Sequence, residues 1–408
     1  MVHWTDFGVN KTSGFSARRR SEFPPLLQAL IDELAVGMTE PLIGLTTDGT
    51  VRKGLYALEA PGASTAPITE AAHAFLEALE VDRRSRAVFP LEAEQRRTWL
   101  NIHPNVFRHG VMLEDLSQEQ RELGLSLLRA TLSHRGFGQA RDIMRLNQLL
   151  VHLSNSPDEF GEWPYFVSVF GDPASGEPWS WQLDGHHLCL NCTVIGDHMV
   201  LSPTFMGSEP CHVYAGPFAG TTVFAAEERA GFDLMRSLGD AQAATAILRL
   251  SIHPDDLPPE LQHPAHGRMR AGAFQDNARI GYEGVAGADL SDAQRKLLLL
   301  LIATYVGWTS DGHAEVWMRK VDAYLDETYF AWMGATDPEG PFYYRVQSPV
   351  VLIEFDHHPG VVFDNNIPSR NHIHTVVRMP NAGDYGVDLL RQHYDRFDHS
   401  SGRHVERS

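Results

Sequence analysis

Apolar residues recur at helical spacing through the first part of the chain. From residue 23 to 38 they lie three and four positions apart, along one side of a helix: Leu26, Leu27, Leu30, Ile31 and Leu34. The same spacing predicts further helices over 68–79, 117–132 and 136–153. Ser117 followed by Gln120 forms a capping box, which marks the start of one of these helices. Residues 23–155 are therefore predicted to be mostly helical.

The pattern changes after Pro164, where short apolar runs and alternating positions are typical of strands. Strands are predicted over 165–170, 179–190, 197–203, 329–333, 342–347, 350–356, 361–364 and 372–379. Helices are predicted over 227–250, 291–305, 313–326 and 385–394. The stretch 253–281 is rich in proline, histidine and glycine, which predicts a long loop of the kind that often has a function. Short polar links between the last strands predict an antiparallel meander.

This order of elements favours an α+β fold over a doubly wound one. We expect a mostly helical N-terminal part packed on a largely antiparallel sheet that ends in a C-terminal strand meander. Residues 1–22 are predicted to be a disordered lead-in, and residues 23–400 a single large domain. Within that domain a helical subregion covers 23–155 and a mixed sheet and helix subregion covers 160–400. No internal repeat is expected in the chain.

Composition and charge narrow the class of protein. The chain has 408 residues, is 43% hydrophobic and has a formal net charge of -18. The acidic balance argues against binding to nucleic acid or to anionic membranes, and a small molecule is the expected partner. Three cysteines are too few for a disulfide framework, and the first residues lack an apolar signal segment, so a cytoplasmic location is expected. Oligomeric state stays open.

Histidine is unusually frequent, with 21 copies, several of them in close pairs. His372 and His374 lie two residues apart in a predicted strand, so both side chains point to one face. Arg378 shares that face. Two imidazoles at this spacing can converge on one metal ion, because neutral histidine is a common metal ligand. An ordinary polar strand face is the competing interpretation.

Two carboxylates could complete such a site. Glu354 and Asp356 share one face of the preceding predicted strand, while Ile353 and Phe355 share the other. If this strand lies beside residues 372–378, the carboxylates face the histidines. We predict Glu354 as a metal ligand and Asp356 as a catalytic group. A pair of surface acids is the alternative.

A third polar stretch runs from Trp179 to Asn191 and contains His186 and His187. On a continuous strand these two histidines point to opposite faces, so at most one would reach a given pocket. Both are kept as candidate ligands. The nearby cysteines, Cys189 and Cys192, are interpreted as core residues, since a single Cys-x-x-Cys does not make a closed zinc site.

Arginine and aromatic residues are the candidates for holding a substrate. Guanidinium groups bind carboxylates through paired hydrogen bonds, and Arg378 and Arg345 are predicted to have this catalytic role. The other predicted substrate-binding residues are Arg97, Arg108, Trp181 and Tyr344. Ordinary salt bridges are the competing interpretation for each arginine.

Together these residues predict a metal-dependent enzyme acting on a small acidic or carbonyl-bearing molecule. A divalent ion, zinc or iron, would polarise the substrate or activate water in hydrolytic or lyase chemistry. A non-haem iron oxidoreductase with the same ligands, a metal-free enzyme using His374 as a base, and a ligand-binding protein are the alternatives. The sequence lacks the motifs of nucleotide-binding folds, serine hydrolases and zincins.

Three motifs also resemble a known family. Residues 181–188 (WQLDGHHL), 343–345 (YYR) and 372–378 (HIHTVVR) are similar to the proteins grouped as domain-of-unknown-function family 3500. Residues 41–49 and 97–110 are similar as well, and the resemblance covers nearly all of residues 24–398. The family usually has tryptophan where Val377 stands here. The resemblance implies no particular activity.

Overall fold

The structure is a computed structural model. It describes residues 25–37, 39–58, 61–103, 105–153, 160–263, 265–360, 365–398 and 405–406. The predicted lead-in over 1–22 and the predicted strand over 361–364 lie outside these residues.

The helices match the apolar spacing in most places. Their bounds are α1 Pro25–Val36, α2 Ala66–Ala78, α3 Val81–Ala87, α4 Gln118–Thr131, α5 His134–Leu153, α6 Ala225–Ser237, α7 Asp240–Ala246, α8 Asp292–Val306, α9 Asp311–Ala323 and α10 Val387–Arg396. The capping box at Ser117 and Gln120 is confirmed. The single helix predicted over 227–250 is wrong: the chain leaves helical geometry at Leu238, starts α7 after Gly239 and then enters a short strand.

In the part of the chain that the structure describes, twelve strands form one mixed, largely antiparallel sheet, and the α+β class is confirmed. Their bounds are β1 Val88–Phe89, β2 Val111–Met112, β3 Phe166–Phe170, β4 Trp179–Asp184, β5 Leu188–Ile195, β6 His198–Ser208, β7 Ile247–Arg249, β8 Val285–Ala286, β9 Tyr329–Gly334, β10 Phe342–Gln347, β11 Leu352–Gly360 and β12 Asn365–Arg378. The order is β1-β3-β4-β5-β6-β12-β11-β10-β9-β7, with β2 beside β3 and β8 beside β9. The predicted C-terminal meander is therefore confirmed in β9–β12. A separate pair, β13 Phe397–Asp398 and β14 Val405–Glu406, lies at the C-terminus.

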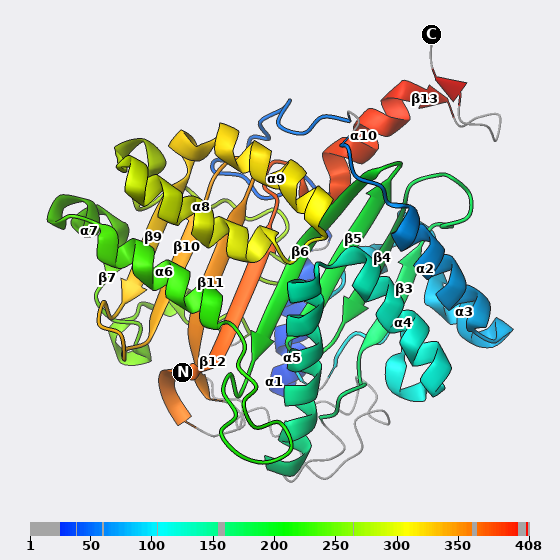
Figure 1. Ribbon diagram of the computed structural model, residues 1–408, viewed down its shortest axis with the longest axis horizontal. Helices are drawn as coiled ribbons and strands as arrows, with labels where there is room; N and C mark the ends of the chain where they lie inside the picture. Colours follow the sequence, from blue (N-terminus) through cyan, green and yellow to red (C-terminus); the bar gives the residue numbers. More distant parts are fainter. Residues whose placement is uncertain are drawn as a thin grey trace.

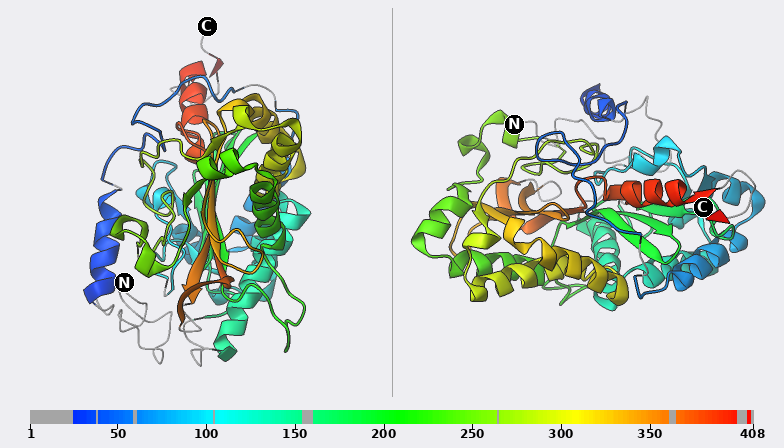
Figure 2. Two further views of the ribbon diagram at one scale, coloured as in Figure 1. Left: turned by 90° about the vertical axis from the view of Figure 1, so that its left-hand side faces the viewer. Right: turned by 90° about the horizontal axis from the view of Figure 1, so that it is seen from above.

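The two faces of the sheet are covered differently. Helices α4, α5, α6, α8 and α9 pack on one face, and the other is covered mainly by loops, α1 and α10 (Figures 1 and 2). Alternate residues of β11 and β12, such as Ile353 and Ile373, enter the large apolar core under the helices. Their neighbours Glu354 and His374 point to the loop-covered face, as alternation along a strand predicts. Among the described residues, no helix combines the length and apolar character needed to cross a membrane.

The sheet contains an internal repeat, so the expectation of a chain without one is wrong. Strands β3-β4-β5-β6 and β9-β10-β11-β12 are two meanders that meet side by side at β6 and β12. Each is preceded by a short strand and two α-helices. The short strand pairs with the first strand of its meander: Val111 pairs with Val167 in the first repeat, and Val285 pairs with Phe330 in the second. Across the sheet the first meander runs from β3 to β6, and the second runs in the opposite order, from β12 to β9. An approximate two-fold axis between β6 and β12 therefore relates the two halves.

The residues before each meander repeat as well. Identical pairs are Gly110/Gly284, Val111/Val285, Asp115/Asp289, Leu116/Leu290, Ser117/Ser291, Gln120/Gln294 and Arg121/Arg295. Both serines cap their helices through the same capping box. Gly110 and Gly284 have φ of 89° and 95°, and a Cβ on either would lie within 2.3 Å of a carbonyl oxygen of the following meander. Only glycine fits this close approach without strain.

Candidate functional site

Three histidine side chains converge near one end of the β6–β12 pair, where the two repeats meet. His372 and His374 come from β12, and His187 comes from the turn between β4 and β5. The three Nε2 atoms lie 3.0, 3.1 and 3.2 Å from one another. All three side chains are buried, and among the described residues they form a group able to hold a metal ion.

His187 reaches this position through an unusual backbone conformation. Its φ of 61° is in the left-handed region, which is rare for a residue with a Cβ. The conformation is held at both ends: the His187 N–H donates to the Asn101 carbonyl at 3.0 Å, and its carbonyl accepts from the Gly207 N–H at 2.8 Å. Strained residues held in this way often occur at functional sites.

The predicted continuous strand over 179–190 is therefore wrong, and with it the reason given for separating His186 from His187. Both lie in the turn that follows Asp184. His186 stacks on His187 with ring centroids 3.9 Å apart, and its Nδ1 lies 2.7 Å from Asn147 Oδ1 on α5. His186 thus supports the cluster from behind and is outside the group of converging nitrogens.

The protonation of the cluster follows from burial and hydrogen bonding. Burial, and then the neighbouring imidazoles, hold the pKa of His187 and His374 well below the ordinary value, so both are neutral. His372 Nδ1 lies 2.6 Å from the Pro359 carbonyl, to which it donates its proton. In a neutral imidazole that donates in this way, Nε2 keeps its lone pair, which is the arrangement that orients metal-ligating histidines. His374 Nδ1 is buried and has no such partner among the described residues.

A small cavity of about 20 Å³ lies against the cluster. This is room for about one water molecule. Besides the three histidines it is lined by Asn101, Ile102, His103, His186 and Glu209. Glu209 is buried, and its Oε2 lies 3.7 Å from His372 Nδ1. Sequence reasoning missed Glu209, which follows β6 and belongs to none of the motifs.

The two predicted carboxylates lie on the same face of the sheet as the histidines, but their hydrogen-bond partners are other residues. Asp356 is directly opposite His374 in the β11–β12 ladder, so the two strands lie side by side, which was the condition of the prediction. Its carboxylate accepts from Arg268 Nε at 2.5 Å and lies 2.8 Å from His358 Nε2. Because Asp356 is committed to this pair, the geometry favours a structural role for it.

Glu354 is not part of the metal-ligand group that was predicted to include it. It accepts from the backbone N–H groups of Arg270 and Ala271, and from the Tyr343 hydroxyl at 2.6 Å. These donors come from the 253–281 loop and from β10, so Glu354 anchors that loop on the sheet. Strand alternation gives the face on which a side chain lies, but not which partner it meets there.

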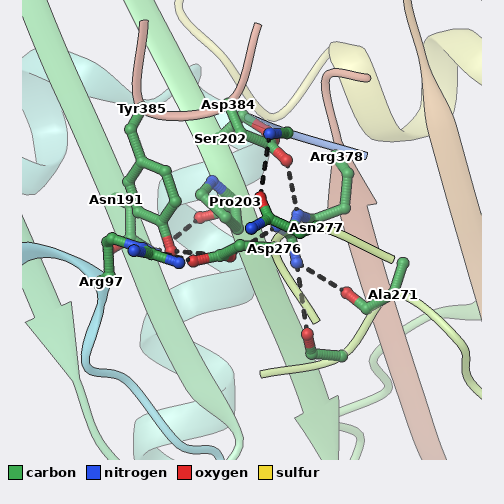
Figure 3. Close-up of polar contacts among 12 residues, drawn as sticks. Arg97, Asn191, Ser202, Pro203, Ala271, Asp276, Asn277, Arg378, Asp384 and Tyr385 are labelled. Carbon is green, nitrogen blue, oxygen red and sulfur yellow. Dashed lines mark hydrogen bonds and ion pairs between the residues drawn. The ribbon is translucent and has the colours of Figure 1, made fainter. Parts of the chain in front are cut away.

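Arg378 and Arg97 belong to a second buried network (Figure 3). Arg378 is fully buried and donates to Asp276 and Asp384 at 2.8 Å each, and also to the carbonyls of Ala271 and Gly272. Arg97 Nε donates to the other oxygen of Asp276 at 2.9 Å. The guanidinium of Arg378 is thus engaged with the protein itself, which favours a structural role over the predicted catalytic one.

Trp181 and Tyr344, two of the other predicted substrate-binding residues, lie away from the cluster. Trp181 and Tyr344 point into the apolar core under the helices, and Tyr344 donates to the Glu227 carbonyl at 2.9 Å. They lie on the face opposite His374, which corrects the prediction of one shared site. Arg345 pairs with Glu283, and Arg108 Nε donates to the Asn105 carbonyl at 3.0 Å.

Asp184 links the histidine turn to the loop that follows Arg97. Its burial predicts how the stability of the protein depends on pH. Its Oδ1 accepts from the Leu100 N–H at 3.0 Å and lies 3.3 Å from Cys189 Sγ. Burial raises the pKa of Asp184 to about 7. The folded state then binds more protons than the unfolded one, so stability falls as pH rises from about 4 to about 7. The difference between the ordinary pKa of an aspartate and a pKa of about 7 corresponds to ~4 kcal/mol of stability.

Replacing Asp184 with asparagine should remove this pH dependence. In urea unfolding at several pH values, the free energy of unfolding of Asp184→Asn relative to the wild type should rise by several kcal/mol between about pH 4 and 8. Other titrating groups cancel in that difference. Parallel pH curves for the two proteins would contradict the prediction.

Comparison with known proteins adds the family and nothing on activity. No curated protein and no solved structure matches the chain. The family model described as protein of unknown function (DUF3500) matches residues 61–387. This span includes all three clustered histidines and both repeats. The chain therefore belongs to the DUF3500 family.

Proposed function

We propose that His187, His372 and His374 bind a divalent metal ion, and that the protein is a metal-dependent enzyme of the hydrolytic or lyase type. The observation that supports this is the convergence of three buried Nε2 atoms at 3.0–3.2 Å. Ligand nitrogens at 2.0–2.1 Å from a tetrahedral zinc ion are roughly 3.3 Å apart. The spacing of the cluster is close to this value.

Hydrogen bonding among the histidines does not explain the cluster as well. Each neutral imidazole has one N–H, and His372 uses its own at Pro359. Its Nε2 can therefore accept but not donate. If His187 and His374 both donate to it, their own Nε2–H groups oppose each other at 3.1 Å. If only one donates, two lone pairs meet instead. A cation between the three nitrogens removes this conflict.

The neighbouring cavity suggests the chemistry. Three histidines leave a fourth position of a tetrahedral ion open, as in catalytic zinc sites. The cavity beside the cluster has room for about one water and is lined by Glu209 and Asn101. A bound metal would lower the pKa of that water and polarise a carbonyl group. Glu209 would orient the water. Arg378 and Arg345 were expected to bind an acidic substrate, but they pair with carboxylates of the protein itself. Of the two expected substrate classes, we therefore propose the small carbonyl-bearing molecule.

Iron chemistry is the second candidate, and Glu209 is the observation that favours it. Non-haem iron sites that activate dioxygen often use two histidines and one carboxylate. Glu209 is the carboxylate that lines the cavity with the cluster. Three histidines without a carboxylate among them favour zinc, and so zinc is the first choice.

Elemental analysis tests the proposal. The purified wild-type protein should contain about one equivalent of zinc or iron, and His374→Ala and His187→Ala should contain almost none. His73→Ala removes a half-exposed histidine on α2 and should keep the metal. A wild-type protein that contains no metal and takes none up during dialysis against zinc or iron(II) would sink the proposal. Identification of the metal decides between the two candidates.

A further inference from the structure

Two further histidines lie against ligand rings of the proposed metal site. His186 stacks on His187, and His358 lies across the ring of His374; the ring centroids are 3.9 Å apart in both pairs. The ring planes differ by 25° in the first pair and by 37° in the second. All four side chains are buried. The outer histidines come from different elements, His186 from the turn before β5 and His358 from β11.

The outer ring of His186 is held by a side chain of α5. Its Nδ1 lies 2.7 Å from Asn147 Oδ1, and Asn147 Nδ2 donates to the Gly161 carbonyl at 2.7 Å. A carbonyl oxygen only accepts, so the bond to Gly161 fixes the amide with Oδ1 toward the histidine. His186 then donates through Nδ1. Asn147 thus sets both the tautomer and the orientation of the ring that covers His187.

The outer ring of His358 is held by a buried ion pair. Its Nε2 lies 2.8 Å from Asp356 Oδ2, and Asp356 Oδ1 accepts from Arg268 Nε at 2.5 Å. The backbone beside Arg268 leaves room for the ring: Gly267 has a φ of 59°, and a Cβ there would lie 2.3 Å from His358 Cε1. Glycine at this position lets the 253–281 loop close over His358 without displacing it from His374.

The ligand rings are packed on other sides as well. A Cβ on Gly207 would lie 3.0 Å from His374 Cδ2 and 3.2 Å from His187 Cδ2, so the backbone of β6 lies against both rings. Phe205 meets His374 edge to face, with centroids 5.1 Å apart. A ring that is already fixed loses little rotational freedom when it binds an ion, and this preorganisation increases affinity.

We propose that His186 and His358 are positioning residues of the metal site, which hold the rings of His187 and His374 in the geometry that binds the ion. The inference rests on the proposed metal site. Neither residue belongs to the group of converging ligand atoms found among the described residues, so their contribution is made through the rings that they cover. Stacked aromatic rings attract each other, and the polar anchor of each outer ring fixes its orientation.

Zinc affinity of the full chain, measured by competition with a chromophoric chelator, tests the proposal. His186→Ala and His358→Ala should each bind zinc roughly 10–100-fold more weakly than the wild type, as loss of residues that orient metal ligands usually does. His186→Phe keeps a stacked ring and should recover most of the loss. Asn147→Leu keeps the imidazole but removes its acceptor, so its affinity should lie between those of His186→Ala and the wild type.

His313 of α9 provides a matched control, because it is also buried and held by polar contacts. Its Nδ1 lies 3.2 Å from Ser310 Oγ, and its Nε2 lies 3.1 Å from the Asp197 carbonyl oxygen. His313→Ala should lose stability but bind zinc like the wild type. The visible spectrum of the cobalt(II) form reports ligand geometry. It should change in His186→Ala and His358→Ala and stay unchanged in His313→Ala.

The outcomes separate this inference from the proposed function. A wild type that binds neither zinc nor cobalt overturns the metal site and the inference with it. A wild type that binds zinc, with the same affinity in His186→Ala and His358→Ala, overturns the positioning role alone, and so does an equal loss in His313→Ala. A loss in one alanine variant only removes the other histidine from the role. Circular dichroism checks folding, and His186→Leu or His358→Leu replaces an alanine variant that does not fold.

Discussion

Replacing Arg378 with methionine should lower the free energy of unfolding by about 3–5 kcal/mol. Methionine keeps most of the side-chain volume but leaves Asp276 and Asp384 without the cation that lies between them. Both carboxylates and the guanidinium are buried, so water cannot take over the lost contacts. Removing one member of a buried ion pair costs more than the pair contributes, because a charge stays buried without a partner.

The pH dependence of this loss has a definite sign. Burial already raises the pKa of Asp384 above its ordinary value, although Arg378 opposes the rise. Without Arg378 the rise is larger, and the folded state of the variant binds more protons than the unfolded state. The stability difference from the wild type should therefore be smallest near pH 4 and grow as pH rises.

A matched surface variant shows whether burial causes the effect. Arg391 pairs with Asp388 and Asp395 on α10, and its side chain is 52% exposed. Arg391→Met should change stability by less than about 1 kcal/mol, as exposed ion pairs usually do. Urea unfolding of both variants measures the difference. Equal losses for Arg378→Met and Arg391→Met would show that Arg378 does not have the structural role inferred here.

Strand alternation predicted the loop-covered face of the site well. It placed His372, His374 and Arg378 on one side of β12, and Glu354 and Asp356 on the same side of β11. Both strands have one apolar face in the core, so apolar and polar residues alternate clearly along their sequences. The pairing of Asp356 with His374 does not follow from alternation alone, because the β11–β12 register shifts twice between this pair and Gly360.

The roles of these polar residues could not be predicted from the strands. Several partners of Asp356 and Glu354, including Arg268, come from the 253–281 loop. This loop has no periodicity from which its path could be predicted. His187 reaches the cluster through a left-handed turn that a continuous strand does not contain. Such a conformation is specified by contacts with Asn101 and Gly207, both distant in the sequence. Loop-mediated contacts of this kind are absent from any local pattern.

The repeat had a sequence signal that secondary-structure patterns do not use. The two segments that begin at Gly110 and Gly284 share identical residues at the turn, the cap and the first helical turn. The meanders that follow have diverged. By the registers of the strand ladders, Val350 is equivalent to His187 and Val200 to His374. Because the ligand positions differ, the two halves present different chemistry at equivalent places. Within the meanders the relation is shown by the strand registers and not by residue identity.

Removing metal from the wild-type protein should lower its stability by about 4 kcal/mol, if free metal was present at roughly 1,000 times its dissociation constant. An ion that binds only the folded state adds this free energy by mass action. The folded cluster suits such binding, because its three nitrogens are already held 3.0–3.2 Å apart by β12 and the His187 turn. Thermal unfolding with and without a chelator measures the effect.

Stability measured in this way separates a metal centre from a hydrogen-bonded cluster. His372→Ala should unfold at the same temperature with and without chelator, since one of the three ligands is gone. His73→Ala should lose as much stability as the wild type when the metal is removed. If the cluster is only a structural hydrogen-bond network, His372→Ala destabilises the protein, but chelator has no effect on any of the three proteins. That outcome would remove the metal from the proposed function while leaving the geometry of the site intact.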